Sequence, residues 1–551
     1  MMVWTREPQL LESLNLAVSD LLADQKPNGQ FGTEPWISTD QNVLLALATA
    51  WSLENSAHHQ SDRVLDAIAR GGQALIDAQD DKGMFTFRKK DHSTWGQIYM
   101  PWVYSRWMRA FAIVKDALPT NIKTQYGDAL YKGYDGIART AIGHVHNIPT
   151  HHAMGLYCAG EVFEREDWKQ QSRDFMARVI AEQSSQGWWA EHKGPVVAYN
   201  FVYVEALGVY YAMSGDDSGL EALQRAAHYH AACVYPDGSL LETVDGRNPY
   251  HTGVRLGNVG FSHTPEGRGF LSQQHSIYLS EGKMFDADYA AQMLLYGTDG
   301  EAIAPASAQD RHVTRLDDDA MMKREQPWFI ALSGFTTEIP QNRWGQDRQN
   351  FVSIYHDDLG LIVGGGNTKL QPLWSTFTVG DVSLLAHQAG DEDPDFSAPE
   401  GLTHIPECAK VHEDDKHPTL TLKYGEEDCR VTVQAKSETT LDLVLATTVA
   451  SDSPVEAHLT LIPHLSKVMK SEDKTADTLN DAHIVWQNPQ WVSHAGWRMT
   501  VPEGGRVEWP VLPHNPYRKD GKAMIEEARI VVLVPFNKGT KRQVINLTIE
   551  K

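Results

Sequence analysis

Apolar residues in the first half of the chain recur three or four positions apart, which is the spacing of one face of an α-helix. Leu10, Leu14 and Leu21 lie on one such stripe, and residues 43–53 form the next. The pattern continues to about residue 297 and predicts roughly ten to twelve helices, enough for about five or six helical hairpins. The predicted helices cover residues 10–22, 43–53, 64–75, 97–116, 122–143, 151–164, 167–183, 199–213 and 218–234, with a last pair within 271–297.

Four of the predicted helix ends carry a glycine followed by bulky or apolar residues, at Gly29, Gly83, Gly187 and Gly238. Their spacing is about 52 residues or twice that value, which indicates a repeated unit. A unit of this length fits a helix pair with its loops. Because helix pairs cannot bury their apolar faces alone, they stack on their neighbours. We expect the pairs to close into a ring that carries these four turns on one rim.

The second half of the chain changes to an alternation of apolar and polar residues, which is typical of half-buried strands. Residues 298–326 lack either periodicity and predict a linker. The chain therefore reads as a multidomain α+β protein. We expect an (α/α) toroid over 1–297, a complete or incomplete six-hairpin barrel, followed by an antiparallel β-sandwich over 327–551. The clearest predicted strands are 419–424, 430–434, 441–445, 458–462, 529–534 and 544–549.

The length and the net charge of the chain limit the classes of function that it can have. A chain of 551 residues exceeds the usual single-domain limit of about 250–300. The net charge of −23 argues against broad binding to nucleic acid or anionic membranes, although a few local arginines can still hold an acidic substrate. No apolar run reaches about 18 residues, and the N-terminus lacks a secretory signal. We expect a cytoplasmic protein, or a periplasmic one if a leader has been removed, and homo-oligomerisation stays open.

The loops after the third and fourth glycine turns carry the candidate chemistry. The third leads through Trp188 and Glu191 to Tyr199. A glycine-punctuated stretch with many histidine, arginine, tyrosine and carboxylate groups is more typical of an active or binding site than of a structural loop. In the fourth loop these residues are Glu242, Asp245, Arg247, Tyr250, His251 and Arg255.

A further cluster, Asn147, His151 and His152, surrounds Pro149 at the predicted start of a helix. Proline suits the first turn of a helix, where the backbone N–H groups favour negative charge, so this is a natural seat for a substrate carboxylate. The alternatives are a metal site, for which no Glu or Cys completes a ligand pattern, and histidines that only cap and pack. No metal ion or cofactor is predicted. The acidic run 391–395 favours a solvated loop over a calcium site.

This order of features resembles the heparinase II/III and alginate lyase group of polysaccharide lyases. The resemblance implies that Tyr199 is the general acid and base, and that Asn147 with His151 or His152 neutralises a uronate carboxylate. It also implies that His251 shares proton transfer. The substrate-binding residues would be Asn147, His151, Trp188, Glu191, Arg247, Tyr250 and Arg255, and the catalytic ones Tyr199, His152 and His251.

The chain departs from the family pattern in two places. Gln186 precedes Gly187 where the family has an acidic residue, and the β domain shows no clear histidine-bearing catalytic strand unless Tyr355-His356-Asp357 supplies it.

The chemistry of β-elimination also fits these residue types. The reaction removes the C5 proton of a uronate while charge develops on its carboxylate, so a donor or cation must sit on that group. A tyrosine with an ordinary pKa of about 10 acts as base near neutral pH only if nearby positive charge or donors lower that pKa. We expect an acidic oligosaccharide or polysaccharide as substrate, held where the segments near 150, 195 and 250 meet around one hollow.

Two other functions remain open at this point. A glycoside hydrolase of the glucuronidase type would use two carboxylates as acid and base or acid and nucleophile, and Glu191, Glu242 and Asp245 are the candidates. A non-catalytic glycan-binding or epimerase-like protein is the third reading.

Overall fold

The computed structural model describes residues 2–387, 396–414 and 416–550, so the acidic run 391–395 lies outside the described residues. The chain forms two compact units, which we call the helical unit and the β unit. Each is described by itself. The helical unit comprises Met1–Trp189, Tyr199–His228 and Leu256–Ala304, and the β unit comprises Ala190–Ala198, Tyr229–Arg255 and Pro305–Lys551.

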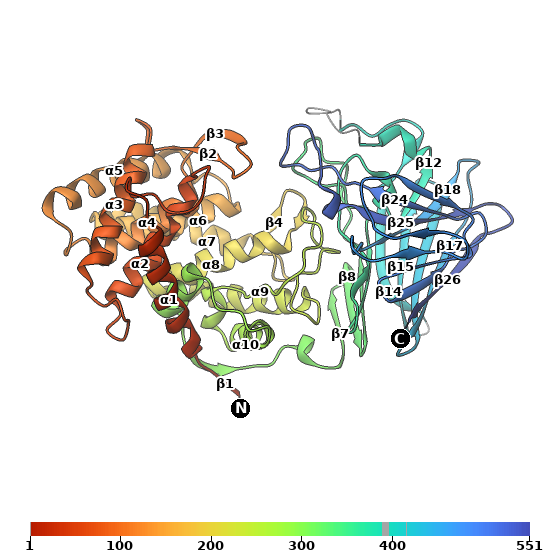
Figure 1. The fold of residues 1–551 in the computed structure, drawn as a ribbon, viewed down its shortest axis with the longest axis horizontal. Coiled ribbons are helices and arrows are strands. Elements are labelled where there is room, and N and C mark those ends of the chain that lie inside the picture. The colour runs from red at the N-terminus through yellow and green to blue at the C-terminus, as the bar shows by residue number, and fades with distance from the viewer. Residues whose placement is uncertain (1, 388–395, 415, 551) are drawn as a thin grey trace. The chain divides into compact units, whose positions relative to one another are not determined.

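Helices build the first unit, in agreement with the sequence periodicity (Figure 1). Every predicted helix has a counterpart within the described residues. None of the helices there is both long and apolar enough to cross a lipid bilayer. The helices are α1 (Pro8–Asp24), α2 (Val43–Ser52), α3 (Asp62–Ala78), α4 (Pro101–Val114), α5 (Thr120–Thr140), α6 (Asn147–Val162), α7 (Glu166–Ala181), α8 (Val197–Ser214), α9 (Leu220–Ala232), α10 (Pro265–Ser280) and α11 (Ala287–Tyr296).

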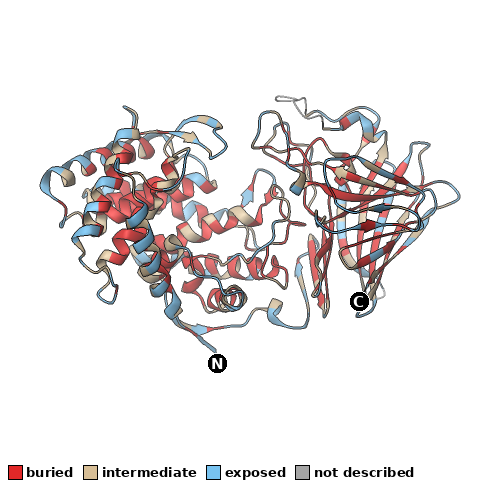
Figure 2. Ribbon diagram, in the orientation of Figure 1, coloured by how far each residue is buried: buried red, intermediate tan, exposed pale blue. Residues whose placement is uncertain are grey.

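The helices divide into an inner and an outer set. α4 and α6 are buried along most of their length, whereas α3, α5 and α7 bury only one face (Figure 2). α2 packs against α4 and α4 against α6, and α11 packs against both α1 and α2. The last helix therefore returns to the first, as expected for a toroid of stacked hairpins.

The glycines of the four turns have backbone angles that other residues rarely adopt. Gly29, Gly83, Gly187 and Gly238 have φ values of 81°, 87°, 93° and 78°. A Cβ atom on Gly29 would lie 2.1 Å from a backbone oxygen of α3, and one on Gly187 would lie 2.2 Å from a backbone oxygen of α9. Only glycine allows both the backbone angle and this close approach of turn and helix.

A glutamine four residues before each of the first three glycines fixes the turn to the next outer helix. The Gln25 amide donates to the turn glycine oxygen (3.1 Å) and to Ala67 (2.9 Å). Gln183 repeats both hydrogen bonds, to its turn glycine (3.0 Å) and to Ala222 (2.9 Å). Gln79 makes the equivalent bond to the outer helix (3.0 Å). The repeat predicted from glycine spacing therefore has a repeated hydrogen-bond basis.

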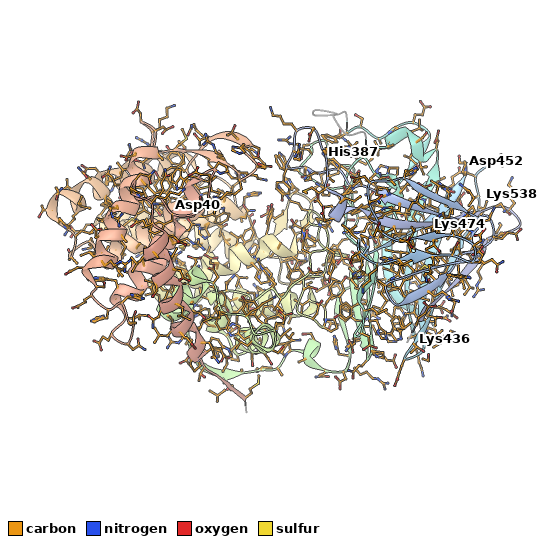
Figure 3. The ribbon with its side chains drawn as sticks, viewed as in Figure 1. Asp40, His387, Lys436, Asp452, Lys474 and Lys538 are labelled. Atoms are coloured by element: carbon orange, nitrogen blue, oxygen red, sulfur yellow. The ribbon has the colours of Figure 1, made fainter. Side chains whose placement is uncertain are left out.

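The loops after the first two turns are joined to one another by a single lysine. Lys90 donates to the Thr33 carbonyl oxygen (2.8 Å) and to the Asp40 carboxylate (2.6 Å). Asp40, labelled in Figure 3, also accepts the backbone N–H of Ile37 (3.1 Å). Short antiparallel pairs complete this unit: β1 (Met2–Trp4) with β6 (Gly300–Ala302), and β2 (Phe85–Arg88) with β3 (Thr94–Ile98).

Two antiparallel sheets form the β unit, and all six strands singled out from the sequence are confirmed. The described residues of the first sheet contain β7 (Arg311–Leu316), β8 (Ala320–Glu325), β9 (Trp328–Ser333), β10 (Val352–His356), β11 (Gly360–Val363), β12 (Phe377–Gly380), β13 (Leu402–Thr403), β18 (Val455–Leu461), β21 (Ile484–Gln487), β24 (Arg506–Val511) and β25 (Arg529–Phe536). Those of the second contain β14 (Cys408–Asp414), β15 (His417–Tyr424), β16 (Glu427–Ser437), β17 (Thr440–Thr447), β19 (Met469–Lys470), β20 (Thr475–Ala476), β22 (Trp491–His494), β23 (Trp497–Thr500) and β26 (Arg542–Ile549).

One hydrophobic core joins the two sheets into a sandwich. Leu332 and Ile354 of the first sheet belong to the same buried cluster as Leu422, Val433 and Leu547 of the second. Within the second sheet, β17 lies between β16 and β26, so the last strand of the chain pairs inside the sheet.

The prediction of a linker over 298–326 is wrong. This segment contains β6 and the hairpin β7–β8, which pairs from Arg311 with Glu325 to Leu316 with Ala320. The charged run 315–319, which masked the strand pattern, contains the hairpin turn, where Asp317 has a φ of 47°. Charge at a turn on the sheet edge interrupts the apolar alternation without ending the sheet.

Candidate functional site

The first predicted site segment is the N-terminus of α6 in the helical unit. α6 begins at Asn147, with Pro149 in its first turn. The Asn147 side chain is 7% exposed, and its Oδ1 atom is buried without a hydrogen-bond partner among the described residues. A buried amide oxygen of this kind is costly unless something else satisfies it. Asn147 is therefore a candidate for contact with a bound group.

His151 lies one turn further along α6 and belongs to a buried charge network. The side chain is 0% exposed, its Nε2 lies 3.3 Å from a Glu205 oxygen, and its ring packs edge-on to Trp102 at 4.7 Å. Arg106 bonds the same glutamate at 3.3 Å and Asp288 at 2.6 Å. Burial lowers the pKa of His151, so the imidazole packs in neutral form inside the unit.

The same network sets the charge of its glutamate. Burial alone would raise the pKa of Glu205, but Arg106 and His151 together bring that pKa well below its usual value. Glu205 is therefore ionised, and its negative charge orients His151 and, through α6, the turn that carries Asn147.

His152 is buried as well, with 3% of its surface exposed. Burial, followed by the neighbouring His151, lowers the pKa of His152 to about 3. The ring is neutral at physiological pH. It therefore cannot supply the positive charge that would lower a tyrosine pKa or neutralise a carboxylate.

The third glycine turn is tied to the start of α8. The Asn200 side chain accepts the backbone N–H of Trp189 (2.6 Å) and donates to its carbonyl oxygen (3.0 Å). Trp189 also stacks on Tyr203, with ring centroids 5.0 Å apart. These contacts fix the first turn of α8, where the half-buried Tyr199 lies directly before Asn200. Trp188 is half-buried and donates to Gln186 (2.8 Å).

In the β unit, Arg348 joins the two loops that carry the remaining candidates. Its fully buried guanidinium donates to the carbonyl oxygens of Pro195 (2.8 Å) and Val244 (3.3 Å). Cβ atoms on Gly194 and Gly246 would lie 2.7 and 2.4 Å from this guanidinium. Glycine at both positions lets Arg348 reach between residues 190–198 and 241–255.

Glu242 faces the interior of the β unit. One carboxylate oxygen accepts the Tyr235 hydroxyl (2.7 Å), and the other accepts the Ser353 hydroxyl (2.8 Å) and the Gly365 N–H (3.0 Å). Burial raises the pKa of Glu242. The glycine run 364–366 lets the backbone approach this carboxylate: a Cβ on Gly364 would lie 2.6 Å from it.

Asp245 is likewise 2% exposed and holds its own loop. It accepts the backbone N–H groups of Arg247 (2.8 Å), Asn248 (2.7 Å) and Ala198 (3.3 Å). Burial raises the pKa of Asp245. Because internal donors occupy the carboxylates of Glu242 and Asp245, neither is placed to act as the acid, base or nucleophile of a hydrolase.

The hairpin of β4 (Ala190–Glu191) and β5 (Gly194–Pro195) carries His192, a residue that the sequence pattern does not single out. Glu191 is 2% exposed, whereas His192, at the tip, is exposed and has a φ of 60°. His192 Nε2 lies 3.4 Å from Arg247 Nη1. In the sequence, His192 stands directly after the candidate Glu191 and seven positions before the candidate Tyr199, and this position is the only local sign of it.

The other candidates of the β unit have mixed positions. Tyr250 is half-buried, donates its backbone N–H to the Gly365 oxygen (3.2 Å) and packs edge-on to Tyr235. His251 and Arg255 are exposed. Roles for these three residues, and a hollow shared by the segments near 150, 195 and 250, stay predictions.

The strand considered for a catalytic histidine has a packing role. His356 is 1% exposed, lies 4.7 Å edge-on to Trp328 and bonds the Glu438 carbonyl oxygen at 3.0 Å. Within the described part of the chain, no group of three or more His, Cys, Asp or Glu residues is placed to hold a metal ion.

Comparison with known proteins adds information at the level of the fold. No protein-family model and no curated protein sequence matches the chain. Solved structures do match: a Paenibacillus xanthan lyase (TM-score 0.54, 12% identity), a Streptomyces coelicolor A3 chondroitin AC lyase (0.53, 13%) and heparinase III (0.53, 12%). Each match covers 99% of this chain. This chain has the fold of polysaccharide lyases.

The matches cover different shares of the solved proteins. The chain spans 57% of the xanthan lyase, 80% of the chondroitin AC lyase and 85% of heparinase III. Because each match runs over almost the whole of this chain, it includes both the helices and the sheets. The predicted resemblance to helical-toroid and β-sandwich lyases is confirmed as a likeness of fold.

Proposed function

We propose that this protein is a polysaccharide lyase that cleaves a uronate-containing glycan by β-elimination. The observation that carries the proposal is a buried Asn147 amide at the start of α6 and Tyr199 in the braced first turn of α8, both on a lyase fold. A solved structure of the chondroitin AC lyase neighbour shows that enzyme in complex with chondroitin sulphate, which is an acidic polysaccharide.

Each residue receives a role from the chemistry of elimination. Tyr199 acts as base and acid: the C5 proton is removed, its electron pair forms the C4–C5 double bond, and the C4–O bond breaks. The departing oxygen takes a proton from the acid, so no redox step occurs. Asn147 hydrogen-bonds the uronate carboxylate, on which charge develops in the transition state.

The β unit has basic side chains in its own loops. Arg247 provides a permanently charged guanidinium suited to bidentate contact with a carboxylate, and the exposed His192 lies beside it. His151 acts indirectly in this proposal, because it is held by Glu205 inside the unit and sets the position of α6.

The buried carboxylates favour a lyase over a hydrolase. Two of the three hydrolase candidates, Glu242 and Asp245, bond backbone and side-chain donors of their own unit. A pair of carboxylates free to flank a glycosidic bond, which hydrolysis requires, is not formed by these two residues.

The test measures the ultraviolet absorbance of the new double bond and the reducing ends together, on alginate, hyaluronan, chondroitin sulphate, heparan sulphate and xanthan. Tyr199→Phe should lower kcat by at least about a hundredfold, because it removes the proton-transfer group. Tyr211→Phe, on the same helix, is the matched control and should keep activity. New reducing ends without absorbance, or full activity in Tyr199→Phe, would reject the proposal.

A further inference from the structure

We propose that a cavity in the β unit, with His404 in its wall, binds a neutral, hydroxyl-bearing sugar unit. Residues 336–339 and 402–407 line this cavity, together with Ala398. Its volume is about 310 Å³, at the lower end of the range of about 300–1,000 Å³ for small-molecule sites, so one sugar unit is a ligand of suitable size. None of these residues takes part in the proposed lyase reaction, and the assignment therefore does not depend on it.

His404 presents a hydrogen-bond acceptor to the cavity. The residue is 1% exposed, and its Nε2 atom lies 3.1 Å from a carboxylate oxygen of Asp347. Because an ionised carboxylate can only accept, Nε2 carries the hydrogen of this bond, and Nδ1 of the neutral imidazole is then an acceptor. Nδ1 has no hydrogen-bond partner among the described residues, yet it is not one of their fully enclosed polar atoms. A donor group of a ligand in the cavity can satisfy it.

A buried lysine balances the charge of Asp347. Lys369 Nζ donates to the other carboxylate oxygen of Asp347 (3.0 Å) and to the Pro340 carbonyl oxygen (2.7 Å). Both side chains of this ion pair are almost fully buried. Burial lowers the pKa of Lys369, and Asp347 opposes that effect. Because the lysine already serves as counter-ion, His404 is not needed for that purpose, and Asp347 acts on it as a hydrogen-bond acceptor that fixes the ring.

The rest of the wall combines hydroxyl groups with apolar side chains. Thr336 and Thr403 are half-buried, and their hydroxyls form no hydrogen bond with a described residue. Ile339, Leu402 and Ile405 supply apolar surface. A few polar groups that fix orientation within an apolar wall are typical of small-molecule sites. A sugar ring matches this wall, because it has hydroxyl groups around its edge and C–H groups on its faces.

The charges at the cavity favour a neutral ligand over an anionic one. Glu407 is exposed and forms no ion pair with a described residue. Glu338 pairs with Lys193 at 2.9 Å, but both side chains are largely exposed, so water screens the pair. A uronate carboxylate or a sulfate would lie near the unbalanced carboxylate of Glu407 and be repelled. The cavity is therefore suited to a neutral sugar.

The first experiment measures the binding of lactose, cellobiose and N-acetylglucosamine to the full-length protein by saturation-transfer difference NMR, with glucuronate as the anionic probe. At least one neutral sugar should bind saturably, and glucuronate should bind at least about tenfold more weakly. His404→Gln keeps a donor for Asp347 and removes the Nδ1 acceptor, so it should weaken neutral-sugar binding about tenfold. His412→Gln is the control, because His412 is a half-buried histidine of β14 outside the cavity, and its affinity should be unchanged.

The second experiment uses changes that leave the buried ion pair intact. Thr403→Val keeps the shape of the side chain and removes the hydroxyl, so it should weaken neutral-sugar binding at least about threefold. Glu407→Gln should strengthen glucuronate binding and leave neutral-sugar binding unchanged. Circular dichroism checks that each variant is folded.

Three results would overturn the site: no saturable binding of any neutral sugar, glucuronate binding as tight as that of the neutral sugars, or unchanged affinity in both His404→Gln and Thr403→Val. These measurements need no catalysis, so they separate the site from the proposed function. A protein that binds a neutral sugar through His404 and yields no double bond from any glycan would support the site and reject the lyase.

Discussion

Two glutamates, one half-buried in the helical unit and one buried in the β unit, are held by different kinds of partner. Glu205 in the helical unit is ionised by Arg106 and bonded to His151. Glu242 in the β unit is surrounded by a tyrosine hydroxyl, a serine hydroxyl and a backbone N–H. The pKa of Glu205 is lowered, against the effect of burial, while burial raises the pKa of Glu242.

The difference shows what holds each candidate loop. The helical unit positions α6 with ionic contacts that need charge on both sides. The β unit positions the loop 241–255 with neutral donors that tolerate a protonated carboxyl. Removing one partner should therefore cost more in the helical unit than in the β unit.

The largest expected effect comes from Arg106→Met. This change leaves Glu205 and Asp288 without their shared cation, and a broken, mostly buried ion pair typically costs about 3–5 kcal/mol. Urea unfolding followed by circular dichroism of the helices measures the loss. Arg70→Gln, which removes an exposed pair with Asp66, should change stability by less than about 0.5 kcal/mol. Equal effects of the two substitutions would show that the network contributes no more than a surface pair.

An intermediate effect is expected from Tyr235→Phe in the β unit. Glu242 loses the only hydroxyl bonded to one of its oxygens among the described residues, so the free energy of unfolding should fall by about 1–3 kcal/mol. Hydrogen exchange of the peptides that contain β10 and the loop 241–255 reports this region. Tyr355→Phe is the control, since Tyr355 stacks on Tyr235 with an interplanar angle of 16° and loses only a hydroxyl. Matching exchange rates in the two variants would contradict a special role for the Tyr235 hydroxyl.

The fold was largely predictable because its signals are local. Helical periodicity and strand alternation depend on residues a few positions apart, so the helices and the six strands were found. The repeat of Gly29 and Gly187 was also visible, because a close backbone approach restricts those positions to glycine. The hairpin β7–β8 was missed, since charged residues at its turn and on the sheet edge hid the alternation.

The site was less predictable because its contacts join distant positions. Glu242 looked like a catalytic carboxylate until its partners Ser353 and Gly365, more than 100 residues away, filled its acceptor positions. His152 is predicted from the sequence to neutralise a carboxylate, but burial by residues distant in the sequence lowers its pKa to about 3. No local pattern links Arg247 to Trp344, whose ring centre lies 5.1 Å from the Arg247 Cζ atom, so this contact is visible only in three dimensions.

The smallest expected effect is a change in the pH dependence of stability, which distinguishes a glutamate with a raised pKa from one with a lowered pKa. The folded pKa of Glu242 is raised above the ordinary value of about 4.3. Between these two values the folded state keeps a proton that the unfolded state has lost, so stability falls as the pH rises through this window. Glu242→Gln removes this loss of stability. Above about pH 4.3 the free energy of unfolding of the variant should therefore rise relative to that of the wild type, by roughly 1.4 kcal/mol per unit of pKa shift.

Glu427→Gln is the matched control within the β unit for this pH measurement. Burial would raise the pKa of Glu427, but the N–H groups of Ser451 and Ala450 bring it below its usual value. The ionised Glu427 stabilises the folded state above about pH 4.3, and this stabilisation is lost as the pH falls through the folded pKa. The free energy of unfolding of Glu427→Gln should therefore fall relative to that of the wild type as the pH rises. Urea unfolding between about pH 4 and 8 gives both slopes. Parallel slopes would show that the pKa values of the two carboxyls are shifted in the same direction, which would contradict the difference expected between Glu242 and Glu427.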